Sequence, residues 1–337
     1  MSTLLPSVRC GIEMALVHLV ARAAGVSIGA AISAASGLPC RSSVEINGLA
    51  ARGEGVPSRE RQRNDSPRVL KVKVGGKAGP IEDAARTAEL VRESTTTGAG
   101  MRGGVGALRD TFRLDANQAW TMDEALLFSS ALADASAAPP GTSSCGCGGG
   151  GRGGGGGGGG GRAGAPELRQ VPGVDLGSVE YIEEPLRNPR SLGTFWERSG
   201  RVVPYALDES LGMGREAFTD KELLELAGCA ALVIKVSVVG GLCRSAKLCR
   251  LAARMGAKAV LSSAFESGVG LAHASILASC FATQGVAHGL STYTRLRGDV
   301  AMPGFSDAVS NGTVDTVACE TLLDGVAKRR HAAVLRQ

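Results

Sequence analysis

Aromatic residues are scarce in this chain. Its 337 residues include 7 Phe, 3 Tyr and 2 Trp, together 4% of the composition. Positive charges are scattered, the net charge is only +5, and a single basic run stands at 328–330. Proteins that bind nucleic acids usually combine a basic face with aromatic side chains that stack on bases. The composition therefore argues against a nucleic acid as the partner.

The chain also lacks a run of about 18 uncharged apolar residues, the length that a membrane-spanning helix requires. We therefore expect neither a membrane span nor a membrane partner. The N-terminus opens on a helix-like segment and displays no signal or transit peptide. Any organelle address is expected on sequence beyond this chain.

Paired cysteine motifs are absent as well. The nine cysteines are dispersed, and no CxxC pair is followed by a second pair or by a His pair. Cys145 and Cys147 lie in low-complexity sequence. Neither a zinc site nor a disulfide framework is indicated, and a reducing compartment fits this pattern best.

What the chain does have is a regular alternation of short β-type runs and helical stretches. After a helix expected at 7–24, the expected strands are 44–46, 69–74, 111–114, 179–182, 205–207, 232–236 and 259–261, with a weaker one at 288–293. The expected helices between them are 80–94, 121–135, 240–255 and 269–283. Such an alternation predicts βαβ units, a parallel sheet and the α/β class.

One segment interrupts the alternation. Residues 136–177 are rich in Ala, Pro, Ser and Gly. Such a segment cannot bury enough apolar surface to offset its entropy, so we expect it to be disordered. We interpret it as an insertion in a loop of one barrel domain at 43–302. A short N-terminal part at 1–42 precedes that domain, and a tail at 303–337 follows it.

Charged side chains stand at the carboxyl ends of the β-type runs. Lys71 and Lys73 are two positions apart, so on a strand both point to the same face. The later runs end in Asp115, Glu183, Asp208 and Lys235. Their spacing is close to one βα unit per step, once the insertion is removed. Such a series describes the C-terminal rim of a barrel, where active sites of this architecture lie.

The residue types at these strand ends suggest a chemistry. Three carboxylates from adjacent strands form an oxygen-ligand site for a hard cation, which favours Mg²⁺, with Mn²⁺ as an alternative. Two neighbouring lysines disfavour each other's charge, so one is expected to have a lowered pKa and to act as a base. A metal beside a lysine base suits removal of a proton next to a carboxylate.

Each of these residues has an ordinary interpretation when it is taken alone. A strand-end lysine is usually a solvated charge, a Glu-Glu-Pro often starts a helix, and an aspartate often closes a turn. Five such positions in register with the βα period are hard to assign to turn chemistry. The pattern as a whole therefore favours catalysis.

The motifs resemble the muconate-lactonising-type branch of the enolase superfamily, whose barrels carry KxK, DxN, E-E/Q-P, DES and a final K in this order. The stretches that carry the resemblance are LKVKVGG, RLDANQAW, YIEEPLRNP, ALDESL, VIKVSVVGG and SSAFESGVGL. Within that branch the chain looks most like the o-succinylbenzoate synthases of menaquinone and phylloquinone biosynthesis. The resemblance implies a (β/α)7β-type TIM barrel. It also implies that residues 1–42 keep only the last helix of an N-terminal capping domain.

The resemblance further implies a role for each charged residue at the rim. Asp115, Glu183 and Asp208 would bind Mg²⁺. Lys73 would remove the α proton and then assist the loss of hydroxide, and Lys71 would tune it. Lys235, from the opposite side, would stabilise the enediolate.

Other positions would serve the substrate or support the ligands. By resemblance, Arg113 would help to hold the substrate, and Ser262 and Ser263 would receive its succinyl carboxylate together with the start of the next helix. Asn117 would support the Asp115 loop, and Glu209 would lie behind the ligands.

The implied reaction is the dehydration of 2-succinyl-6-hydroxy-2,4-cyclohexadiene-1-carboxylate, so the partner is a small carboxylate. An N-acylamino-acid racemase or a dipeptide epimerase of the same branch would instead use Lys73 and Lys235 as two bases. Residues 285–300 carry no DxD motif of the kind that holds a dipeptide amine, which favours the lyase. A third possibility is a non-catalytic barrel in a fused protein. Plants and algae carry the synthase within a fused pathway protein, which implies further domains as partners and the chloroplast, with the cytoplasm as the alternative.

Overall fold

A computed structural model describes residues 4–50, 69–101, 110–137, 176–212, 217–281, 285–301 and 304–334. Two helices come first, α1 (Pro6–Ala23) and α2 (Ile28–Ser36). α1 is the helix expected at 7–24, whereas α2 was not expected. The glycine-rich segment lies almost entirely outside the described residues, so its disorder and the domain limits stay predictions.

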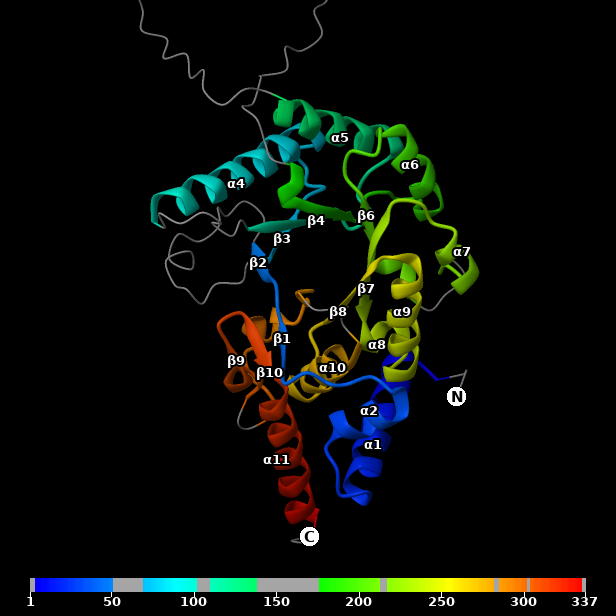
Figure 1. The fold of residues 1–337 in the computed structure, drawn as a ribbon, viewed down its shortest axis with the longest axis vertical. Helices are drawn as coiled ribbons and strands as arrows, with labels where there is room; N and C mark the ends of the chain where they lie inside the picture. Colours follow the sequence, from blue (N-terminus) through cyan, green and yellow to red (C-terminus); the bar gives the residue numbers. More distant parts are fainter. Residues whose placement is uncertain are drawn as a thin grey trace, which may run out of the picture.

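Seven parallel strands form one curled sheet, in the order β2-β3-β4-β5-β6-β7-β8 (Figure 1). They are β2 (Gly48–Ala50), β3 (Val69–Lys73), β4 (Thr111–Asp115), β5 (Val179–Glu183), β6 (Tyr205–Leu207), β7 (Cys229–Lys235) and β8 (Lys258–Ser262). Strands that are neighbours in the sheet are also consecutive in the chain, which is what successive βαβ units produce. The predicted α/β architecture is confirmed.

A short segment near residue 288 closes this sheet into a barrel. Gly289 pairs in parallel with Ser262 at the end of β8, and His288 pairs in parallel with Ile46 just before β2. The weak strand expected here is therefore real at these two residues. It does not continue, because the chain turns into the 3-10 helix η4 (Ser291–Arg295). The closed parallel sheet is the TIM-barrel-like fold that the resemblance implied.

Helices cover the outer face of the sheet (Figure 1). They are α4 (Pro80–Met101), α5 (Met122–Ala137), α6 (Leu192–Arg198), α7 (Asp220–Leu224), α8 (Val236–Val239), α9 (Leu242–Met255) and α10 (Gly268–Phe281). The four longest correspond to the expected helices. The three short ones, α6 to α8, were not predicted, because an element of one or two turns shows no helical periodicity. α7 nevertheless begins with a capping box, in which Thr219 and Glu222 each bond the other's backbone amide.

Short 3-10 turns join several of these elements. They are η1 (Leu176–Ser178), η2 (Pro189–Ser191), η3 (Glu209–Leu211) and η5 (Phe305–Ala308). η3 follows β6 directly, so it lies at the rim where the strand-end charges were expected. These turns tighten the connections between strands and helices.

The C-terminal tail packs back onto the start of the barrel. β1 (Ser43–Glu45) forms a small antiparallel sheet with β10 (Thr313–Asp315) and β9 (Val309–Ser310), and α11 (Thr316–Val334) follows. The run at 44–46 was expected to be the first barrel strand. That expectation is corrected, because β1 belongs to this separate sheet.

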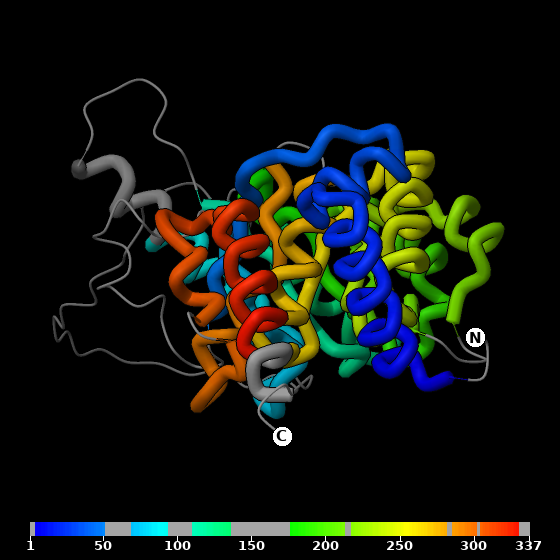
Figure 2. Tube along the Cα trace, turned by 90° about the horizontal axis from the view of Figure 1, so that it is seen from below, coloured from blue at the N-terminus to red at the C-terminus, as the bar shows by residue number. Residues whose placement is uncertain are grey.

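The terminal helices α1 and α11 lie side by side below the barrel (Figures 1 and 2). His18 and Arg22 of α1 reach Asp324 of α11, at 3.4 Å and 3.8 Å. α10 packs against both α2 and α11. The terminal helices therefore form one layer around α10.

A disulfide joins Cys40, just before β1, to Cys280 in the last turn of α10. The sequence indicated no disulfide framework, and this single pair corrects that expectation for these two residues. They are 240 positions apart, so no local spacing announces the pair. The bond ties the N-terminal segment to a barrel helix.

The barrel has an inner and an outer apolar core. Val233 and its cluster partners Tyr181, Ala206 and Val260 belong to a small inner set, and Leu232 to the large outer set beneath the helices. Because side chains alternate along a strand, Val233 and Lys235 point to the same inner face. The inner core therefore lies directly beneath the charged rim.

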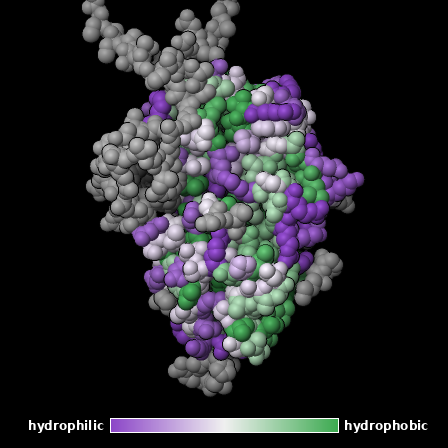
Figure 3. Space-filling view, viewed as in Figure 1, coloured by the Kyte–Doolittle hydropathy of each residue, from purple (hydrophilic) through white to green (hydrophobic). Residues whose placement is uncertain are grey.

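One face of α1 remains apolar and exposed. It carries Val8, Ile12, Leu16 and Leu19, with Leu5 just before the helix, and apolar residues gather over α1 and α2 at the lower right of Figure 3. Among the described residues no single helix is long and apolar enough to cross a membrane. α1 and α2, bent by 97° at their junction, reach that length and composition only as a pair.

Candidate active site

The predicted site residues meet at one rim of the barrel. Lys73 stands opposite Asp115 in the pairing of β3 with β4, and Asp115 stands opposite Glu183 in the pairing of β4 with β5. Asp208 follows β6 directly, and Lys235 ends β7. Because all these strands are parallel, their carboxyl ends lie on the same side of the sheet.

Lysines and carboxylates alternate along the first half of this rim. Lys71 Nζ lies 2.8 Å from Asp115 Oδ2 and 2.6 Å from Glu183 Oε1. Lys73 Nζ lies 2.5 Å from Asp115 Oδ2 and 2.5 Å from Asn117 Oδ1. The amide of Asn117 donates to Asp115 Oδ1 at 3.0 Å. Asn117 therefore contacts both the carboxylate and the lysine.

The other half of the rim carries a second pair. Lys235 donates to the carboxylate of Asp208, and Asn117 Nδ2 donates to Glu209 Oε1 at 3.0 Å. Asp208 is 3% exposed, whereas Glu209 is exposed. The structure thus brings together all the residues predicted as metal ligands and catalytic lysines.

The carboxyl groups of this cluster differ in their pKa values because their charges are compensated to different degrees. Burial, and after it the charges of Asp115 and Asp208, raise the pKa of Glu183 well above its usual value, although Lys71 opposes them. Burial also acts to raise the pKa of Asp115, but Lys71 and Lys73 outweigh it and hold that pKa below its usual value. Glu183 is therefore the carboxyl whose charge is least well compensated.

The pKa values of Lys71 and Lys235 are raised rather than lowered. Burial acts to lower the pKa of Lys71, but the carboxylates of Glu183 and Asp115 outweigh it and raise that pKa. Asp208 raises the pKa of Lys235 against the same effect of burial. The mutual lowering predicted for a lysine pair does not hold for Lys71, because the carboxylates of Glu183 and Asp115 lie 2.6 Å and 2.8 Å from its Nζ.

The donor set fits a hard divalent cation. Asp115, Glu183 and Asp208 are at most 3% exposed and offer only oxygen. The raised pKa of Glu183 marks negative charge that a cation among the three carboxylates would relieve. Among the described residues no three His, Cys, Asp or Glu side chains form a ready-made metal site. Lys71 bridges two of the three carboxylates instead.

Arg113 lies deeper in the barrel than its predicted substrate role would suggest. Its side chain is 2% exposed. Nε donates to Glu180 Oε2 at 2.5 Å, and Nη1 donates to the carbonyl of Ala287 at 2.6 Å. Lys258 binds the other oxygen of Glu180 at 2.5 Å. Arg113 thus links β4 to the closing segment, and its contact with substrate stays a prediction.

Ser262 and Ser263 lie at the end of β8, where they were expected. Ser263 Oγ donates to the carbonyl of Gly289 at 3.0 Å and lies 2.7 Å from Thr292 Oγ1. Ser262 Oγ is 3.4 Å from the same carbonyl. Both hydroxyls therefore bind the closing segment in this structure, and their contact with a substrate carboxylate stays a prediction.

The start of α10 is engaged by a side chain of the protein itself. Both oxygens of Asp299 accept from the amide of Gly268 at 2.9 Å. This helix end was expected to receive the substrate carboxylate. A carboxylate of the chain lies there instead, which satisfies the first orphan amide of the helix.

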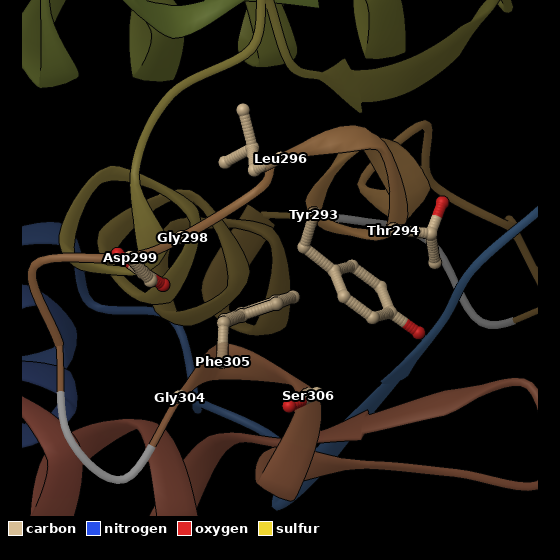
Figure 4. A pocket seen from close by; sticks show the side chains of 8 residues that line it. All are labelled: Tyr293, Thr294, Leu296, Gly298, Asp299, Gly304, Phe305 and Ser306. Atoms are coloured by element: carbon tan, nitrogen blue, oxygen red, sulfur yellow. The ribbon is translucent and has the colours of Figure 1, made fainter.

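A hollow of about 300 Å³ lies beside this helix start, between η4 and η5. Its lining residues are Tyr293, Thr294, Leu296, Gly298, Asp299, Gly304, Phe305 and Ser306 (Figure 4). The rings of Tyr293 and Phe305 meet edge to face, 5.5 Å between centroids. None of the predicted site residues lines this hollow.

Sequence reasoning left one buried acid of the rim without a role. Glu184 is 0% exposed and accepts hydrogen bonds from Gln118, Asp208 and Ser210. The second Glu of the EEP motif was visible in the sequence. Only the tertiary structure shows which loops it joins.

The chain is similar to known proteins over most of its length. Residues 167–316 match the Enolase C-terminal domain-like family. Protein PHYLLO, chloroplastic, of Arabidopsis thaliana is 29% identical over an alignment of 328 positions, which covers 89% of this chain and 16% of that protein. An o-succinylbenzoate synthase of Yersinia pseudotuberculosis is 34% identical over 125 residues, 37% of this chain and 36% of that enzyme. The matched regions thus span well under half of each relative.

Solved structures show the same fold. The muconate lactonizing enzyme from Pseudomonas fluorescens, complexed with muconolactone, superimposes with a TM-score of 0.64 at 16% identity. The match covers 91% of this chain and 67% of that chain. The dipeptide epimerase from Methylococcus capsulatus, complexed with Mg and the dipeptide L-Arg-D-Lys, gives 0.58 at 22% identity, over 92% and 70%.

Proposed function

We propose that this chain belongs to the muconate-lactonising-type branch of the enolase superfamily and is a Mg²⁺-dependent lyase that forms o-succinylbenzoate by dehydration. The observation that carries the proposal is the ring of charges at the barrel rim. Three buried carboxylates lie between two lysines on β3 and one on β7. The relatives by sequence support the choice of dehydration.

The two catalytic lysines approach from opposite sides. Counted around the sheet with its closing segment, β3 and β7 lie across the barrel from each other. Lys73 is 40% exposed and Lys235 is 24% exposed, so both reach the mouth while the carboxylates stay beneath. A planar carboxylate substrate between them would present one face to each lysine.

Each residue then has a task. Mg²⁺ held by Asp115, Glu183 and Asp208 would neutralise the negative charge that grows on the substrate carboxylate. Lys73 takes the α proton and returns it to the departing hydroxide, so that water leaves and no net proton is consumed. Lys235 stays protonated and stabilises the enediolate by its charge.

An epimerase of the same branch is the competing assignment. The same two lysines would then each exchange a proton on one face. A Lys235→Arg variant separates the two chemistries, because arginine keeps the charge and cannot serve as a base at neutral pH. Dehydration should keep a measurable fraction of its rate, and epimerisation should be lost.

The decisive assay follows formation of the aromatic product from the cyclohexadiene carboxylate. We expect activity that EDTA abolishes and Mg²⁺ restores. Lys73→Ala should lower kcat by about 10² to 10⁴-fold, the usual contribution of a general acid–base. Lys258→Ala is the matched control, because this strand lysine binds Glu180 at 2.5 Å and is absent from the rim contacts.

Two outcomes would sink the proposal. Exchange of the α proton of dipeptides or N-acylamino acids with solvent, without aromatic product, would favour the epimerase. No EDTA-sensitive turnover in the chain, alone or joined to a capping domain, would favour a non-catalytic barrel.

Location in the chloroplast and further domains of a fused protein are proposed from the Arabidopsis relative. Probing plastid fractions with an antibody to this chain would test both.

A further inference from the structure

The loops that follow β4 and β5 have an unusual backbone. Asn117, Gln118 and Glu184 have φ of 47°, 57° and 43°, in the left-handed region that residues with a side chain seldom adopt. All three lie within three residues of a proposed metal ligand. Such conformations persist only where the surroundings hold them.

Backbone hydrogen bonds join these loops in sequence. The amide of Gln118 donates to the carbonyl of Glu184 at 2.7 Å, and the amide of Glu184 donates to that of Ala206 at 3.0 Å. The amide of Ala116 donates to the carbonyl of Glu183 at 3.1 Å. The loops after β4 and β5 are therefore coupled to each other and to strand β6.

The Glu184 side chain completes this coupling. Oε1 accepts from the amides of Asp208 (2.9 Å) and Ser210 (2.8 Å). Oε2 accepts from Ser210 Oγ (2.9 Å) and Gln118 Nε2 (3.1 Å). Four donors therefore converge on one carboxylate, which offers about four acceptor positions and no donor.

Burial of the Glu184 carboxylate costs free energy, which argues that this side chain has a function. Glu184 is 0% exposed and adjacent to Glu183, and no lysine or arginine among the described residues pairs with it. An apolar side chain would avoid the burial of charge. It would also leave the amides of Asp208 and Ser210 unpaired and the Asp208 loop free to move.

We propose that Glu184 is a positioning residue that sets the Asp208 carboxylate in place relative to Glu183 and thereby sets the affinity of the rim for a divalent cation. The inference rests on the proposed Mg²⁺-dependent function. Glu184 itself touches neither substrate nor metal. It acts through the amide of the ligand residue and through the neighbouring turn.

The test measures Mn²⁺ binding by electron paramagnetic resonance titration, without substrate. Glu184→Ala and the volume-matched Glu184→Met should raise the Kd by about 10 to 100-fold, as loss of a group behind a ligand does. Glu184→Gln should return the Kd toward the wild-type value. Its carbonyl can still accept from both amides, and its NH₂ can donate to Ser210 Oγ.

Glu320→Ala is the matched control. Glu320 also accepts from two backbone amides, those of Ile28 (3.0 Å) and Gly29 (2.7 Å), but it ties α11 to α2. It should lower the melting temperature and leave the Mn²⁺ Kd unchanged.

The outcomes are distinguishable. A folded Glu184→Met or Glu184→Ala protein with the wild-type Kd overturns the positioning role and leaves the proposed function intact. A wild-type protein that binds no Mn²⁺ overturns the proposed function and this inference with it. Equal weakening by Glu320→Ala would assign the effect to general stability and also overturn the positioning role.

Discussion

A buried histidine on the segment that closes the barrel couples folding to pH. His288 is 0% exposed, its Nδ1 accepts from the amide of Leu261 at 3.1 Å, and its Nε2 has no hydrogen-bond partner among the described residues. Burial, and then the positive charges of Arg113 and Arg41, lower its pKa from 6.5 to about 3. The folded protein therefore keeps this ring neutral throughout the physiological range.

The sign of the effect follows from where the proton binds. Between pH 6.5 and 3 the unfolded chain protonates this histidine and the folded chain does not. The stability it contributes is thus fully present above about pH 6.5 and is lost as the pH falls toward 3. The slope approaches about 1.4 kcal/mol per pH unit, so the free energy of unfolding should drop by about 2 kcal/mol between pH 7 and 5.

Other groups also affect the pH dependence of stability, so the contribution of His288 must be measured against a variant that lacks it. Burial also lowers the pKa of His273, which adds to the loss at low pH, and burial raises that of Glu183, which opposes it. Both contributions are common to the wild type and to His288→Asn. The asparagine oxygen can accept from the Leu261 amide and does not titrate. The difference between the two proteins isolates His288.

Urea unfolding at pH 7, 6 and 5, followed by circular dichroism, measures this difference. At pH 7 the variant should be less stable, because the smaller side chain leaves a cavity. The gap should narrow by about 2 kcal/mol by pH 5, since only the wild type loses the His288 contribution. Parallel pH dependences of the two proteins would refute the buried neutral ring.

Two further predictions concern the fold. Reduction of the Cys40–Cys280 disulfide, or the double Cys40→Ser and Cys280→Ser variant, should lower the free energy of unfolding by about 2–4 kcal/mol, because the bond closes a loop of 240 positions. Identical urea transitions with and without dithiothreitol would contradict this. Gly228→Ala should destabilise by about 1–3 kcal/mol beyond Gly37→Ala. Both glycines have positive φ, but a Cβ at Gly228 would lie 2.4 Å from the Trp196 ring and one at Gly37 would meet nothing, so equal melting temperatures would contradict that packing.

The sequence itself determined most of the positions of the charged residues at the barrel rim. Lys71, Lys73, Asp115, Glu183 and Lys235 each stand at the end of a run of β-forming residues, so local pattern placed them on strands. The regular βα spacing then required parallel strands, and parallel strands bring their ends to one rim. The contacts of Lys71 with Asp115 and Glu183 at 2.8 Å and 2.6 Å realise that expectation.

The tertiary structure alone decided which distant groups are partners. Nothing local distinguishes Glu183, which faces the lysines, from Glu184, whose positive φ turns it toward Asp208 and Ser210. Nor does the run at 44–46 reveal that it pairs with the C-terminal hairpin while Gly48–Ala50 forms the first barrel strand.

These choices depend on packing between segments far apart in the chain. Cys40 meets Cys280 because α10 docks beside α2, and Arg113 turns inward because Glu180 and the carbonyl of Ala287 are there to receive it. Strand periodicity places a charge at the rim. Only the closed barrel buries that side chain and brings other charged groups next to it. These two effects decide what the charge contacts and whether its pKa rises or falls.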